Sequence, residues 1–280
     1  MAETENKPSG VVLKYDENNP LHHFLRSAGI ATVSILTLLL VWWFVSLALR
    51  NPALPTPIEV FEALIYLFTV GDTMSSLTMW DNMSISLQRF AVGFLIAFVL
   101  AVPLGLVLGS SPKLNEFATP IYELIRPIAP IAWAPIFLFM FGARTSPSMV
   151  VAIGIFFPLL TNTIFGVTKI DPSHVDAAKT LGANGLQRFL KVTLPSGIPY
   201  IMNGIRIGLG VGWMCIVAAE MIVPIGGGIG YFISIQAQQY MQYTYCWAGI
   251  VVICILGLLT TTLADRVYKL ITRRMGIDAD

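Results

Sequence analysis

Ionisable side chains inside long apolar stretches are the residues of this sequence that could do chemistry. A charged group at membrane depth is costly unless it is paired or contacts water, so each one is a functional candidate. Arg126 and Arg206 each lie eight or nine residues beyond the expected start of an apolar helix. At a rise of 1.5 Å per residue, both would lie about 12–14 Å deep. Two cations at one depth could attract an anion in a cavity open to that side.

Both arginines also have a structural interpretation, which we favour. Glu123 lies three residues before Arg126, so the two side chains can meet on one helix face. Arg206 could reach the phosphate groups of membrane lipid. In that case neither guanidinium group would be available to a passing anion.

Glu220 and two glutamines are further candidates for a path through the protein. Glu220 lies too far along its helix from Arg206 to pair with it. We expect it to make a structural hydrogen bond, to a neighbouring helix or to the glycine-rich turn 226–230, in preference to relaying protons. Gln236 and Gln239, which have aromatic neighbours, could line a gate or belong to an interfacial belt, and both interpretations stay open.

The sequence shows no pattern typical of an enzyme site. Its three cysteines, Cys215, Cys246 and Cys254, lie in apolar runs and are interpreted as small buried hydrophobes. A phosphate-binding G-x-x-x-x-G-K-[ST] loop is absent, and the turn 226–230 lacks a strand–helix context. We therefore expect no catalytic residue, no metal site and no cofactor bound by this chain. A net charge of +1 without a basic block argues against nucleic-acid binding.

The composition is that of an integral membrane protein. The 280 residues are 55% hydrophobic and 12% charged, whereas soluble domains have about 25% charged residues. Several apolar blocks approach or exceed the 20 or so residues that cross a bilayer as a helix. The fold class predicted is therefore an all-α membrane protein with six transmembrane helices. These spans are predicted at residues 27–49, 84–109, 117–141, 147–168, 198–223 and 245–270.

Prolines and glycines distinguish two of the spans. The third should be kinked or broken, because it contains Pro120, Pro127, Pro130 and Pro135. The fifth should pack inside the bundle, because small residues let helix backbones approach closely. Its small residues are Gly204, Gly208, Gly210 and Gly212.

The lysines and arginines predict the orientation in the membrane. With the N-terminus inside, twelve of them fall in inner segments and three, Arg50, Arg89 and Arg144, in outer segments. Positive charge concentrates on the cytoplasmic side, so both termini are expected there. The chain would then consist of a cytoplasmic N-terminal segment, residues 1–26, and a transmembrane domain, residues 27–280, in the plasma or inner membrane.

Two connections between spans carry helix signals. In the first, Thr56, Pro57 and Glu59 form a helix-start pattern, and the apolar residues that follow suggest a short helix along the outer interface. In the second, residues 169–197, Asp171 could cap a helix that ends at Gly182. Asn184 could cap a second short helix whose apolar face is Leu186, Phe189 and Leu190. We interpret this pair as a docking surface, and a generic interfacial loop is the alternative.

The second connection resembles the cytoplasmic signature of ABC importer permeases. That signature reads Glu-Ala-Ala, three residues, Gly, nine residues, Ile, one residue, Leu-Pro. This chain has Asp176-Ala177-Ala178, Gly182, Val192, Leu194 and Pro195 at the same spacing, with Asp for Glu and Val for Ile. Within that superfamily the chain resembles the nitrate, sulfonate, taurine and bicarbonate branch. The other matching stretches are 54–57, 124–130, 141–142, 218–221 and 228–231.

The resemblance implies the type I ABC importer permease fold and a set of partners. These are a second permease copy, expected to form a homodimer, two cytoplasmic ATPase subunits that bind ATP and Mg²⁺, and an extracytoplasmic substrate-binding protein. Residues 171–190 would be the coupling region held by the ATPase. The residues expected to transmit force are Asp176, Ala177, Ala178, Gly182, Leu194 and Pro195.

The function implied is uptake of a small anion by alternating access. The alternative is a secondary transporter driven by an ion gradient, in which Glu123 or Glu220 titrates. A membrane enzyme is disfavoured, because the sequence offers no nucleophile–base or metal constellation.

Overall fold

The computed structural model describes residues 20–71, 77–223 and 226–274, and all regular structure within these ranges is helical. The chain divides into two compact units, residues 1–58 and 59–280. Within the described part, five helical segments are long and apolar enough to cross a membrane, which confirms the all-α membrane class. They are Gly29–Leu49, Met79–Ser110, Pro130–Thr168, Gly185–Ile222 and Tyr243–Arg273. This is one fewer than expected, because the end of the predicted third span and all of the fourth fall in one segment, while the start of the third lies in a separate helix of 14 residues, Pro112–Ile125.

The first unit consists mainly of helix α1 (Pro20–Leu49), which contains the predicted span 27–49. After α1 the chain turns back on itself. The indole Nε1 of Trp42 donates to the carbonyl of Pro55 at 3.1 Å, and Ser46 Oγ donates to the carbonyl of Leu54 at 2.7 Å. The predicted segment 1–26 lies mostly outside the described residues.

Helix α2 (Pro57–Thr69) begins at the predicted proline. Its apolar side chains Ile58, Phe61 and Ile65 are 51–64% exposed, as an interfacial helix requires.

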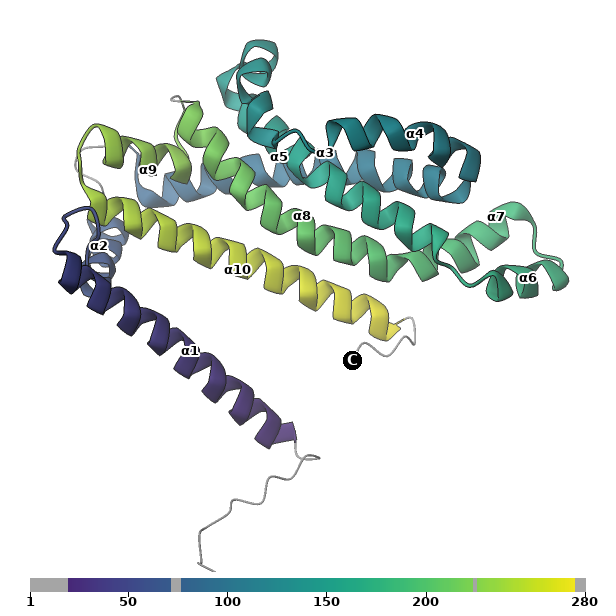
Figure 1. Ribbon diagram of the computed structural model, residues 1–280, viewed down its shortest axis with the longest axis horizontal. Coiled ribbons are helices and arrows are strands. Elements are labelled where there is room, and N and C mark those ends of the chain that lie inside the picture. The colour runs from purple at the N-terminus through teal and green to yellow at the C-terminus, as the bar shows by residue number, and fades with distance from the viewer. Residues whose placement is uncertain (1–19, 72–76, 224–225, 275–280) are drawn as a thin grey trace, which may run out of the picture. The chain divides into compact units, whose positions relative to one another are not determined.

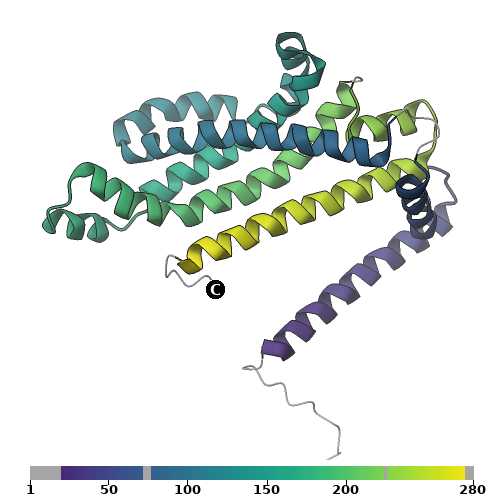
Figure 2. The same ribbon diagram turned by 180° about the vertical axis from the view of Figure 1, so that it is seen from behind.

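The second unit is built around three long helices that lie side by side, with α5 packed against both of the others (Figures 1 and 2). They are α3 (Met79–Ser110), α5 (Ala134–Thr168) and α8 (Leu194–Ile222). Helix α4 (Pro112–Ile125) folds back on α3, and α9 (Ile229–Gln238) and α10 (Tyr243–Arg274) pack on α8.

Close backbone approach joins α5 to α8, as the glycines of the fifth span predicted. Gly204, Gly208 and Gly212 are buried. A Cβ added at Gly204 would lie 2.9 Å from the Cβ of Asn162 and 3.2 Å from the Cα of Leu159, both on α5. The prediction is wrong for Gly210, which is exposed and has no neighbour within 4 Å of an added Cβ.

The predicted third span, 117–141, is not one helix. Helix α4 ends at Ile125, a short 3₁₀ turn, η1, spans Pro130–Trp133, and α5 follows. Prolines remove backbone donors and block the preceding turn, so the expected break is confirmed. A second interruption falls at Gly142, whose φ of +75° and ψ of 168° kink α5. The expected boundaries of this span are therefore wrong.

Helix α8 contains one buried glycine, Gly204, and one exposed glycine, Gly210, and this pair allows a matched test of the packing. Gly204→Ala and Gly210→Ala gain the same helix propensity, about 1 kcal/mol. Only Gly204→Ala forces a methyl group into α5, where overpacking costs about 1–3 kcal/mol. We expect a lower apparent Tm in detergent for Gly204→Ala and an unchanged or higher one for Gly210→Ala. Equal values for the two variants would show that α5 and α8 are not in close contact.

Candidate functional site

The candidate site lies at one end of the second unit, where the first turns of α3 carry a row of polar side chains. The helix starts in a capping box, in which Asp81 N donates to Thr78 Oγ1 at 3.2 Å and Thr78 N donates to Asp81 Oδ2 at 2.9 Å. Asn82, Ser86 and Arg89 follow at spacings of four and three residues, which place them on one helix face. All three side chains are buried.

The carboxylate of Glu220, on α8, accepts hydrogen bonds from this polar face of α3. Arg89 Nη1 donates to Glu220 Oε1 at 3.0 Å, and Ser86 Oγ donates to Glu220 Oε2 at 2.8 Å. The backbone N–H of Gly230 donates to Oε2 at 3.1 Å. The side chains of Arg89 and Glu220 are only 8% and 1% exposed. The expected structural bonds of Glu220, to a neighbouring helix and to the glycine-rich turn, are both present.

The same residues hold the turn 226–230. Arg89 donates from Nη1 to the carbonyl of Gly227 at 2.6 Å and from Nη2 to that of Gly226 at 3.2 Å. Gly228 N donates to Asn82 Oδ1 at 2.9 Å, and Ile229 N donates to Ser86 Oγ at 2.8 Å.

Only glycine fits at position 228. Its φ is +117°, and a Cβ there would overlap the carboxylate of Glu220. We call Asn82, Ser86, Arg89, Glu220 and residues 226–230 the turn clamp.

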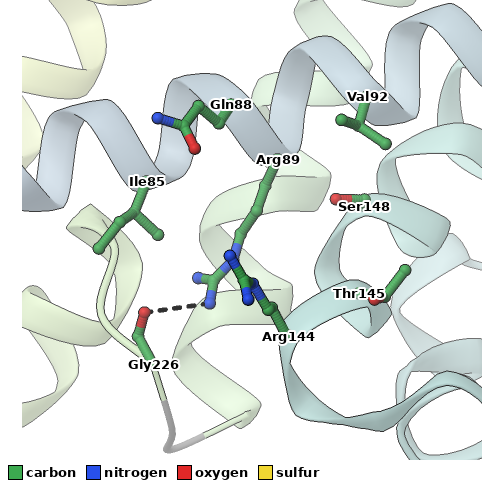
Figure 3. Close-up of a pocket in the computed structure, with 8 residues that line it drawn as sticks. All are labelled: Ile85, Gln88, Arg89, Val92, Arg144, Thr145, Ser148 and Gly226. Carbon is green, nitrogen blue, oxygen red and sulfur yellow. Dashed lines mark hydrogen bonds between the residues drawn. The ribbon is translucent and has the colours of Figure 1, made fainter.

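A cavity of about 570 Å³ lies beside the turn clamp, between α3, α5 and the turn (Figure 3). Two arginines, Arg89 and Arg144, line it, and its lining contains no carboxylate. The complete lining is Ile85, Gln88, Arg89, Val92, Arg144, Thr145, Ser148 and Gly226. The arrangement is suited to attract a negatively charged group.

The other end of the unit carries residues 171–190, which we call the coupling segment (Figure 1). Its first helix is α6 (Pro172–Thr180). Asp171 caps this helix by accepting from Ser173 N at 2.9 Å, and this bond lowers the pKa of Asp171. The cap predicted from the sequence is therefore confirmed.

Gly182 ends α6 as predicted. Its φ is +79°, its N–H donates to the carbonyl of Lys179 at 2.9 Å, and Ala183 N donates to the carbonyl of Ala178 at 3.0 Å. This pair of bonds is a Schellman motif, which favours glycine at the left-handed position.

The second helix of the coupling segment differs from the prediction. Asn184 caps α7 (Gly185–Arg188), since Gln187 N donates to Asn184 Oδ1 at 2.9 Å. The helix then does not stop, but continues through a π-helical turn, η2 (Phe189–Thr193), directly into α8. The expected short helix is therefore the start of a single helical run from Gly185 to Ile222. Single π turns within helices are frequent at functional sites.

The residues expected to transmit force belong to α6, to the turn that ends it and to the start of α8. Asp176, Ala177 and Ala178 belong to α6, and Leu194 and Pro195 open α8. The Asp176 carboxylate pairs with Lys179 Nζ at 2.7 Å, and both side chains are more than half exposed.

The structure does not bring the five path candidates into one site. Arg126 is exposed at the end of α4, and no ion pair to Glu123 occurs among the described residues, so the favoured pairing is wrong. Arg206 instead has a protein partner that the sequence analysis missed, donating from Nε to Asp265 Oδ1 of α10 at 2.8 Å. In α9, Gln236 is fully buried, while Gln239 is exposed just beyond the end of the helix.

Two arginines of the site were assigned to outer segments by sequence analysis. For Arg89 this is wrong, because it lies within α3 and is 7% exposed. The spacing of Asn82, Ser86 and Arg89 carried a usable signal, a polar stripe at helical period just before the strongest apolar run. No local signal marks Arg144 as a neighbour of Arg89.

The fold of this bundle also occurs in a solved ABC transporter. It is similar to a solved structure described as inward facing conformations of the MetNI methionine ABC transporter, with a TM-score of 0.58 and 19% identity. The match covers 71% of this chain and 100% of that one.

Sequence relatives then specify the family. Residues 101–277 match the binding-protein-dependent transport system inner membrane component family. The taurine transport system permease protein TauC of Escherichia coli is 34% identical over 237 residues, 84% of this chain and 85% of TauC. The nitrate import permease protein NrtB of Synechocystis sp. is 34% identical over 223 residues, 78% of this chain and 80% of NrtB.

The chain therefore belongs to the binding-protein-dependent transport system inner membrane component family. It is a membrane-spanning permease subunit of an ABC importer and not an enzyme. The secondary-transporter alternative is set aside, since the fold and the relatives are those of ABC permeases.

The turn clamp predicts a strong energetic coupling between Arg89 and Glu220. Removing one member of a buried ion pair leaves an uncompensated charge and costs about 3–5 kcal/mol. We expect Arg89→Met and Glu220→Gln each to lower the apparent Tm markedly, and the double variant to lose less than the sum. Thermal unfolding of the four proteins in one detergent measures this coupling.

Arg206→Met is the matched control, because its partner Asp265 is 38% exposed and such pairs contribute about 1 kcal/mol or less. If the losses of Tm in the two single variants added up to that of the double variant, or if Arg206→Met lowered the Tm equally, a clamp dominated by this buried pair would be contradicted.

Proposed function

We propose that this permease moves a small anionic solute of the nitrate, sulfonate, taurine or bicarbonate class into the cytoplasm by alternating access. Relatives named for taurine, nitrate and bicarbonate support the substrate class. A cavity lined by two arginines and no carboxylate supports a negatively charged substrate.

The proposed assembly contains a second permease copy, two cytoplasmic ATPase subunits and an extracytoplasmic substrate-binding protein, all within membrane lipid. ATP and Mg²⁺ belong to the ATPase subunits. In this orientation both termini and the coupling segment face the cytoplasm, and the turn clamp faces the exterior. The excess of lysine and arginine near the coupling segment supports a cytoplasmic location for that segment.

The observation that carries the proposal is the architecture of the coupling segment. Two helix caps and a Schellman motif make it rigid, yet Leu181, Leu186 and Leu190 are 87%, 68% and 50% exposed. Exposed apolar side chains gathered on a rigid projection are typical of a protein–protein contact. A groove in the ATPase would cover them.

Force applied to α6 has two direct routes into the bundle. On one side α6 is joined to the end of α5 by residues 169–171. On the other, the turn at Gly182 leads into the continuous helix of α7, η2 and α8. Because α5 and α8 are in close backbone contact, the two would move together. Arg126, Gln236 and Gln239 remain candidates for the path that this movement opens.

Gly182 allows a test that separates docking from folding. Gly182→Ala and Gly182→Trp carry the same penalty at a positive φ, about 1–2 kcal/mol. A Cβ at this position meets nothing within 4 Å, so neither substitution introduces a clash at the Cβ. We expect Gly182→Ala to keep most ATP-driven uptake and Gly182→Trp to lose it or to lose the ATPase subunits on purification. Folded yield, from gel filtration in detergent, should be the same for both.

Equal uptake by Gly182→Trp and Gly182→Ala, with the ATPase retained in both, would contradict a partner surface at this turn. Equal loss in both would assign the effect to backbone strain instead of docking.

A further inference from the structure

Two arginines line the cavity beside the turn clamp, and only one of them is paired with a carboxylate. Arg89 is neutralised there, because its guanidinium group bonds to Glu220 and to the carbonyls of Gly226 and Gly227. Arg144, which lines the same cavity, forms no ion pair or hydrogen bond with the part of the chain that the structure describes. The cavity therefore has a net charge of about +1 from its two arginines and Glu220.

Hydroxyl groups in the cavity are also available to a ligand. Later on α5 and on α10, threonine hydroxyls donate to a carbonyl of their own helix, as Thr161, Thr163 and Thr260 do at 2.7–2.9 Å. Within the described ranges, the hydroxyls of Thr145 and Ser148 have no such bond. Ser148 is only 3% exposed and lies one helical turn after Arg144, so both side chains reach the cavity from the same face of α5.

Gln88 completes the polar lining from the α3 side (Figure 3). Its amide forms no hydrogen bond with the described chain, and it sits one residue before Arg89. The cavity therefore offers a guanidinium fork, two hydroxyls and an amide, with apolar walls from Ile85 and Val92. Planar or trigonal oxyanions are the groups that such a fork binds bidentately.

We propose that this cavity is a binding site for a singly charged oxyanion of a solute, with Arg144 as the charged ligand and Thr145, Ser148 and Gln88 as hydrogen-bonding ligands. Arg89 is a positioning residue that holds the turn as the wall of the site. Its volume of about 570 Å³ exceeds the roughly 30 Å³ of one water, so the anion can enter with part of its hydration shell. The inference deepens the proposed function, on which its transport role rests.

The net charge of the cavity favours singly charged anions over divalent ones. One uncompensated positive charge matches nitrate, bicarbonate or a sulfonate group, and would leave a divalent anion half-neutralised. A phospholipid phosphate has the same oxyanion chemistry, so the test must separate solute from lipid.

Equilibrium binding to the full-length chain tests the site without ATP or transport. The protein is purified in a non-ionic, phosphate-free detergent, and its thermal midpoint is followed against nitrate and ethanesulfonate, with chloride as the ionic-strength control. Ligands that bind the folded state raise the midpoint as their concentration passes the Kd. We expect Arg144→Gln to weaken nitrate and ethanesulfonate binding about 10-fold to 100-fold, as loss of a charged hydrogen-bonding group implies.

Three further variants sharpen the test. Arg144→Lys keeps the charge without the fork and should bind with intermediate affinity, and Ser148→Ala should weaken binding several-fold. Arg266→Gln, which removes an exposed arginine of α10 that does not line this cavity, should bind as the wild type does. Phosphatidylglycerol added to the same micelles supplies the lipid arm.

The outcomes separate this site from the proposed function. Arg144-dependent binding of the soluble anions supports the site, even if the protein shows no ATP-driven uptake and the proposed function fails. Wild-type nitrate affinity in Arg144→Gln overturns the site, even if ATP-driven anion uptake is intact. An Arg144-dependent shift with phosphatidylglycerol alone overturns the assignment to a solute.

Discussion

The buried ion pair between Arg89 and Glu220 is the interaction on which the turn end of this permease depends. Two charges removed from water are stable only when every remaining donor and acceptor is satisfied. Here that requirement is met by Ser86, by the N–H of Gly230 and by the carbonyls of Gly226 and Gly227. The pair thus fixes the relative position of α3, α8 and the turn at once. It also leaves the neighbouring cavity with Arg144 as its uncompensated charge.

Helix α8 connects this clamp to the coupling segment. Glu220 lies near one end of the helix, and the other end is continuous with η2 and α7. Along its length, α8 is held against α5 through buried glycines, so a displacement of the coupling segment cannot be absorbed by sliding at that contact. In the mechanism proposed here, a partner that moves α6 would therefore change the geometry of the bundle as a whole. Both the coupling segment and the clamp act on the same rigid element.

Local features of this structure could be predicted from the sequence, and long-range pairs could not. The caps at Asp171 and Asn184, the turn at Gly182 and the proline break after Ile125 follow from backbone chemistry within a few residues. Arg89 and Glu220 are 131 positions apart, and Arg206 and Asp265 are 59 apart, so no local rule pairs them. Glu123 was favoured as the partner of Arg126 because it is near in sequence, but both side chains are exposed and do not pair. Arg89 was counted among the outer flanks because it lies near the start of the second span, although the predicted bounds 84–109 contain it and α3 begins earlier still, at Met79.

In the mechanism proposed here, ATP hydrolysis by a partner, and not an ion gradient, drives movement through the coupling segment. Uptake of labelled taurine or nitrate into vesicles containing the complete transporter tests it most directly, with the substrate-binding protein present and all ion gradients collapsed by ionophores. We expect accumulation that requires hydrolysable ATP on the cytoplasmic side and persists without any gradient. Uptake that stops when the gradients are collapsed, with ATP still present, would contradict it.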